Sequence, residues 1–86
     1  MKRITAQTQG QYMAQSTADA VQKLGKFEDL CETLAAEKKQ TEQTLEALRT
    51  AGKTKTVQCR EALAQKLSVD YVLTLLQVHG LLAEED

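Results

Sequence analysis

The sequence predicts an all-α protein in which a long, coiled-coil-like N-terminal helix precedes two shorter helices, assembled as an oligomeric helical bundle. Three observations predict this class. The 86-residue chain has no proline, and its sequence is dominated by Ala, Leu, Gln, Glu and Lys, which favour helices. An apolar stripe with steps of four and three residues runs along residues 20–48. Only one Phe and two Tyr are present, so the core must be aliphatic and thin.

The long helix is expected near residues 16–50. Ser16 followed by Asp19 has the form of a capping box, and Gly52 suits the left-handed residue that ends a helix. Gly25 lies inside this helix, either as a bend or close-packing point or as a tolerated residue on an outer face. The stripe contains Leu24, Phe27, Cys31, Leu34, Lys38, Thr41, Leu45 and Leu48.

The flanking segments are expected to be less regular. Residues 1–15 form either a short hairpin turning at Gln9–Gly10 or a flexible tail, because a lone hairpin is marginal in water. Residues 16–82 form one helical domain, with the shorter helices over about 56–67 and 69–79. Ser68 is read as the N-cap of the last helix and Gly80 as the glycine after its end. Residues 83–86 form an acidic tail.

Two arguments predict a homo-oligomer, either a dimer or a tetramer. A helix over 16–50 is roughly 50 Å long, whereas a compact chain of this length has a radius of gyration of about 12 Å. The helix expected over 69–79 is apolar nearly all round and needs cover on several sides. The predicted oligomer interface consists of Leu24, Phe27, Cys31, Leu34, Leu45, Leu48, Val72, Leu73 and Leu76.

A basic segment supports an alternative function. Arg49, Lys53, Lys55 and Arg60 lie close together in sequence with no acidic residue between them, and these are the residues expected to contact nucleic acid. The formal net charge of −1 does not favour a strong nucleic-acid binder. A small nucleic-acid-associated regulator is therefore the alternative, and a protein partner is favoured.

Catalytic and cofactor chemistry is not expected. His79, Cys31 and Cys59 are spaced unlike any standard zinc pattern, and the carboxylates follow charged helical faces, so no metal, cofactor or catalytic residue is predicted. Both cysteines are expected to be free thiols in a reducing compartment. The chain has no apolar run of membrane-spanning length and no secretion signal at its start, so we expect no membrane contact and a cytoplasmic location.

Three segments carry a resemblance to a known group of proteins: Ile4-Thr5, the run from Lys23 to Leu30 that includes Lys-Leu-Gly-Lys-Phe-Glu-Asp, and the tail from Lys55 to Leu82. The chain resembles small uncharacterised proteins of phages and mobile elements in Firmicutes. Many of those have Tyr-Glu-Asp where this chain has Phe27-Glu28-Asp29. The resemblance implies a small accessory protein of mobile-element origin and assigns no activity or site residue. The expected function is that of a non-enzymatic, helical oligomerisation and protein-interaction accessory protein.

Overall fold

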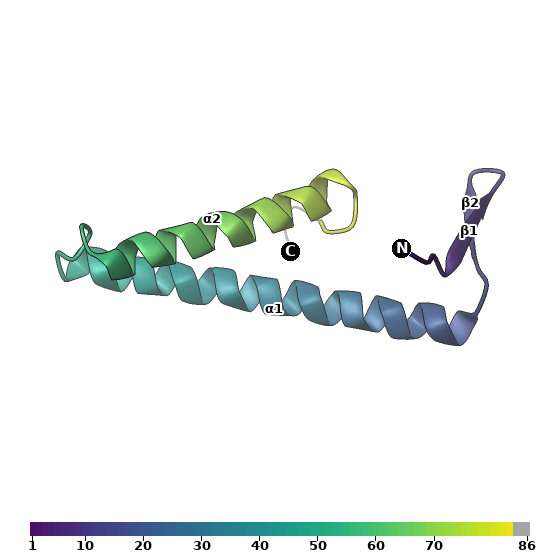
Figure 1. Cartoon of the computed structure of the whole chain (residues 1–86), viewed down its shortest axis with the longest axis horizontal. Coiled ribbons are helices and arrows are strands. Elements are labelled where there is room, and N and C mark those ends of the chain that lie inside the picture. Colours follow the sequence, from purple (N-terminus) through teal and green to yellow (C-terminus); the bar gives the residue numbers. More distant parts are fainter. Residues whose placement is uncertain (84–86) are drawn as a thin grey trace. The chain divides into compact units, whose positions relative to one another are not determined.

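The computed structural model describes residues 1–83 and contains two strands followed by two helices (Figure 1). The elements are β1 (Thr5–Thr8), β2 (Gln11–Ala14), α1 (Thr17–Thr50) and α2 (Val57–Val78). They form two compact units, Met1–Glu32 and Thr33–Asp86, and α1 contributes to both. The predicted acidic tail over 83–86 lies, apart from Ala83, outside the described residues.

The predicted fold class is wrong. Within residues 1–83 the chain is not all-α, because it includes a two-stranded antiparallel sheet, and it has two helices and no helical bundle. The helices expected over 56–67 and 69–79 are one continuous helix, α2, and Ser68 lies inside it. No glycine or proline interrupts α2 at this point, and Asp70 forms an ion pair with Lys66 one turn earlier instead of serving a new helix start. The local cap signal of serine is overridden by these interactions.

Of the two alternatives for the N-terminal segment, the structure has the hairpin. β1 and β2 pair antiparallel from Thr5↔Ala14 to Thr8↔Gln11, closed by a two-residue turn in which Gln9 and Gly10 have φ of 51° and 78°. Two successive positive φ angles are typical of the type I′ turn, whose twist suits a hairpin. The guanidinium of Arg3, which precedes β1, lies 5.9 Å from the centre of the Tyr12 ring in β2, a cation–π contact.

Both helices begin with a side-chain cap, of which the sequence analysis predicted the one at Ser16. The backbone N–H of Asp19 donates to Ser16 Oγ at 3.3 Å, and that of Cys59 donates to Thr56 Oγ1 at 3.1 Å. Each hydroxyl satisfies an N–H group that has no partner inside its helix. These two residues therefore fix where α1 and α2 start.

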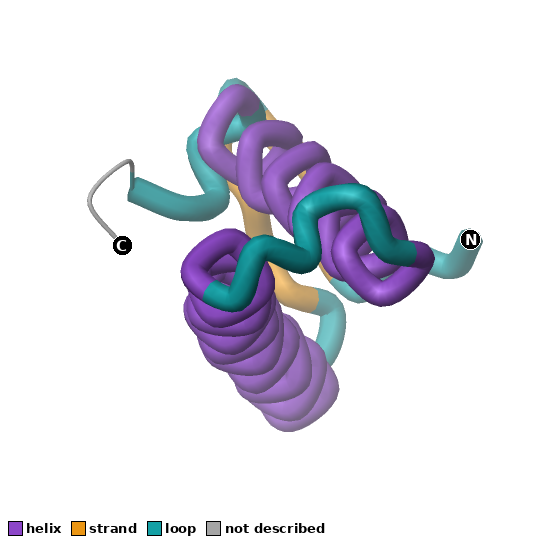
Figure 2. The backbone as a smooth tube through the Cα atoms, turned by 90° about the vertical axis from the view of Figure 1, so that its left-hand side faces the viewer, coloured by secondary structure: helices purple, strands orange, loops and turns teal. Residues whose placement is uncertain are grey.

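Both helices also end with the same glycine motif. Gly52 and Gly80 have φ of 71° and 73°. After α1, the N–H of Gly52 donates to Arg49 O and that of Lys53 to Leu48 O; after α2, Gly80 donates to Gln77 O and Leu81 to Leu76 O. This is the Schellman pattern, which satisfies the last carbonyls of a helix. It stops α1 sharply, so that a short loop suffices to reverse the chain (Figure 2).

Within the second unit, α1 and α2 pack antiparallel along a seam of residues spaced by seven. The buried residues are Leu34, Thr41 and Leu48 on α1, and Ala62 and Val69 on α2. A repeat of seven keeps one side of each helix facing its neighbour, as in a coiled coil. No side chain among the described residues is completely buried, so this core is thin.

Gly25 offers a test of the long helix. It lies in mid-α1, and a Cβ added there would meet nothing within 4 Å, so the structure favours the tolerated-residue alternative. Gly25→Ala should stabilise the protein by about 1 kcal/mol, because alanine has less backbone freedom to lose in a helix. The expected rise in Tm is roughly 4–8 °C, measured by circular dichroism.

Gly52→Ala is the matched control for Gly25→Ala. It also meets no neighbouring atom, but it must adopt a φ of +71°, which strains an L-residue. It should therefore lower Tm. A fall in Tm for Gly25→Ala would contradict the placement of Gly25 in a continuous helix.

Candidate interaction surface

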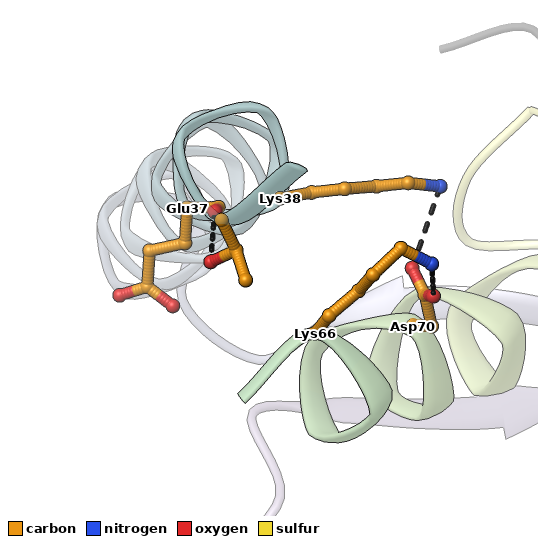
Figure 3. A network of polar contacts seen from close by, with 5 residues as sticks. Glu37, Lys38, Lys66 and Asp70 are labelled. Carbon is orange, nitrogen blue, oxygen red and sulfur yellow. Dashed lines mark hydrogen bonds and ion pairs between the residues drawn. The ribbon is translucent and has the colours of Figure 1, made fainter. Parts of the chain in front are cut away.

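A cluster of three charged side chains joins the two helices at the seam. Lys38 reaches from α1, and its Nζ lies 3.4 Å from Asp70 Oδ1 on α2, while Lys66 Nζ donates to Asp70 Oδ2 at 2.8 Å (Figure 3). Asp70 Oδ1 is buried and has no hydrogen-bond donor among the described residues, so the ammonium of Lys38 is its counter-charge. Because Lys38 is on the other helix, this contact links α1 to α2.

The cluster shifts the protonation of its members. The hydrogen bond from Lys66 lowers the pKa of Asp70 below its ordinary value of 3.8; burial opposes this shift, and the positive charges of Lys66 and Lys38 add to it. The hydrogen bond to Asp70 raises the pKa of Lys66 above 10.5. Both groups are therefore charged at neutral pH, and the pair is an interaction of two ions.

Beside the cluster, Thr41 occupies a buried seam position with a polar side chain. Its hydroxyl donates to the backbone carbonyl of Glu37 at 2.7 Å, so the buried oxygen is satisfied within α1 itself (Figure 3). A groove of about 140 Å³ opens here, lined by Glu37, Gln40, Thr41, Thr44, Ala62 and Gln65. This lining offers hydrogen-bonding groups but a single titratable side chain, Glu37.

The residues predicted for an oligomer interface fall into three groups. Leu34 and Leu48 are buried in the seam between α1 and α2. Leu24 and Val72 are exposed. The rest are partly buried: Phe27, Cys31, Leu45, Leu73 and Leu76. Of these nine residues, Leu24, Phe27 and Cys31 belong to the first unit. Their role between copies of the chain stays a prediction.

The four residues predicted to contact nucleic acid lie at the end of the second unit where the chain reverses. Arg49 is held by Glu46, to which its Nε donates at 3.0 Å, and this contact lowers the pKa of Glu46. Lys53 and Lys55 lie in the loop, and Arg60 lies in the first turn of α2. These last three are exposed and form no ion pair in the described part of the chain.

The structure also reveals an apolar surface that the predicted interface did not include. We call Leu63, Leu67, Tyr71, Leu75 and Val78 the outer stripe of α2; each is between 41% and 75% exposed. At 100° per residue, these positions lie on the side of α2 opposite Ala62 and Val69. The sequence signal is the step of four from Leu63 to Leu75, which the expected division of this segment into two helices at Ser68 interrupted.

The outer stripe carries no charge along its length. Its neighbours on the same side of α2 are Ala64, Ser68 and Thr74, all exposed. The charged residues of the same stretch, Lys66 and Asp70, lie toward the seam and bind each other. An exposed helical face usually carries the charges of its helix, whereas between Leu63 and Val78 the arrangement is reversed.

No protein-family model matches the chain, and no curated protein or solved structure matches it. The resemblance to phage and mobile-element proteins stays a prediction. Neither α1 nor α2 is apolar enough over a sufficient length to cross a membrane. Within residues 1–83, no three His, Cys, Asp or Glu side chains are grouped as metal ligands would be.

The charged cluster predicts a pH-dependent stability. Because the folded pKa of Asp70 is lowered, its contribution is present above pH 3.8 and is lost as the pH falls through the folded pKa. Asp70→Asn should lower the free energy of unfolding at neutral pH by up to about 1 kcal/mol. The difference in Tm between the variant and the wild type should then shrink as the solution is made more acidic.

Glu46→Gln is the control for Asp70→Asn. It removes an ion pair within one turn of α1 that does not connect the helices, so its loss of Tm at neutral pH should be smaller. An Asp70→Asn variant as stable as the wild type at neutral pH would contradict the role of the cluster.

Proposed function

We propose that the protein is a small, non-enzymatic accessory protein that self-associates and presents helices for protein interaction. The observation that carries this proposal is the exposure of the outer stripe of α2. Five large apolar side chains in contact with water cost free energy that a partner removes. The fold within one chain supplies no cover for them in the described residues.

The size of the outer stripe supports a specific contact. Its exposed apolar surface is on the order of 500 Å², in the range of the largest apolar patches on typical monomers, which are often functional. Pairing of two such stripes buries roughly 1,000 Å² in total, which is near the lower limit of specific protein interfaces. A second copy of the chain therefore gives a contact of the size expected for a weak, concentration-dependent dimer.

The chemistry of the outer stripe indicates the class of partner. None of its five residues is Lys or Arg, and Lys66, the one cation between Leu63 and Val78, is paired with Asp70, so the stripe lacks free cations that bind phosphates. Its side chains are those that fill helix–helix contacts, and Tyr71 adds a large amphipathic ring of the kind enriched at interfaces. An apolar helical protein surface fits this composition.

Further features are compatible with an accessory protein rather than an enzyme. The groove between α1 and α2 has one titratable side chain, whereas acid–base catalysis commonly pairs two groups with separated pKa values. Cys31 and Cys59 are free thiols, which suits the reducing cytoplasm where we place the protein. The resemblance to mobile-element proteins supports the same role.

The proposal predicts a concentration-dependent dimer, measured by light scattering after size exclusion. Leu67→Glu should give the mass of one chain, because it places a charge in the centre of the apolar contact. The helical signal in circular dichroism should stay, since Leu67 is 59% exposed and does not support the seam.

Gln65→Glu is the matched control. It adds the same charge two residues earlier, on a side of α2 that faces away from the outer stripe, and should leave the dimer intact. A wild-type chain that stays monomeric into the millimolar range would overturn self-association as the function.

The exposed cations Lys53, Lys55 and Arg60 favour a second candidate, a nucleic-acid-associated regulator. Without acidic partners in the described chain, they are free to bind phosphates. Three such contacts predict that log Kd changes by about 2.7 for each unit of log salt concentration. A gel-shift series with duplex DNA tests this candidate, and the absence of a shift at low salt would dismiss it.

A further inference from the structure

We propose that the second copy binds the outer stripe with its α2 antiparallel to the first, on a two-fold axis between Leu67 and Tyr71. This inference rests on the proposed function and adds the direction and register of the contact. It is drawn from the spacing of the outer stripe and from the distribution of charge along α2.

The spacing sets the register. Leu63, Leu67, Tyr71 and Leu75 follow one another at steps of four, so reversal of the helix lays the same pattern over itself. Leu63 then faces Leu75 of the second copy, and Leu67 faces its Tyr71. All four positions are occupied by large apolar residues, and the contact is the same on both copies, as a two-fold interface requires.

The charges set the direction. The start of α2 is basic, because Lys53, Lys55 and Arg60 are exposed there without ion pairs in the described chain. The last turn of α2 contains no basic residue, and the sequence continues into Glu84-Glu85-Asp86. A parallel pair of α2 helices places two basic ends together, whereas an antiparallel pair places each basic end beside a last turn without basic residues.

The helix dipoles act in the same sense. The carbonyl end of a helix is partially negative and is stabilised by nearby cations. In the antiparallel arrangement, Arg60 faces Val78 of the second copy, close to that end. Like charges within a Debye length of about 8 Å would repel in the parallel arrangement. The middle of the outer stripe is uncharged and favours neither direction of pairing, so the charges at the ends of α2 determine the direction.

Disulfide trapping tests this geometry. In a Cys31→Ala/Cys59→Ala background, Ala64→Cys and Thr74→Cys place thiols on exposed positions flanking the axis. Antiparallel pairing brings position 64 opposite position 74 of the second copy. It leaves each position about 15 Å from its own counterpart along the axis, beyond the roughly 7 Å between Cα atoms that a disulfide can bridge.

When the two single-cysteine chains are mixed, one of them lengthened by a tag, the expected result is a disulfide-linked heterodimer. Each chain alone should form no linked homodimer. Gln65→Cys, on the other side of α2, should give no linked product. Linked homodimers from each chain would show parallel pairing. They would overturn this inference but would still support self-association.

Two other outcomes separate the inference from the proposed function. If light scattering shows a dimer but no mixture is linked, the contact lies elsewhere and the antiparallel stripe is overturned. If the unlinked background protein and the wild type are both monomers throughout the concentration series, the proposed function itself fails. Circular dichroism of each variant confirms that the helices are retained in the sample tested.

Discussion

The described part of the second unit depends on the seam in which one side of α1 meets one side of α2. Its buried members recur every seven residues on each helix. Besides the leucines Leu34 and Leu48, they are small or medium in size: Thr41, Ala62 and Val69. Small residues allow two helices to approach closely, but they bury little apolar area each. The seam therefore holds the helices in place with a small stabilising free energy, and the caps at both helix ends must contribute to stability.

The local signals in the sequence predicted most of the helix ends. Ser16, Thr56, Gly52 and Gly80 each act through hydrogen bonds to residues within five positions, so a single sequence contains all the information they need. The prediction of a helix start at Ser68 was wrong for the opposite reason. The environment of this serine is decided by burial of Val69 against α1 and by the Lys66–Asp70 pair, and serine inside a helix is tolerated when its neighbours are fixed in this way.

The sequence predicted the stripe along α1, but it did not show which part of the stripe α2 covers. A repeat of seven shows that a helix face will be covered and does not show by which chain. From Leu34 to Leu48 the cover is α2, because the Schellman motif at Gly52 turns the chain back at once. The sequence did not decide between a hairpin and a flexible tail for a related reason. Gln9-Gly10 is a weak form of the Asn-Gly turn signal, and strands rich in Gln and Thr favour no particular register.

The polar residues of the seam explain how α2 can have two apolar sides and still fold in one way. α1 has a choice between the side of Val69 and the outer stripe, and the stripe is the more apolar of the two. Docking on the stripe would leave Lys38 beside leucine side chains without its counter-charge, a loss of at most about 1 kcal/mol for a partly exposed ion pair. On the observed side, Lys38 finds Asp70 at 3.4 Å. The charged cluster thus favours the observed side of α2 for packing against α1, and the uncharged side stays exposed.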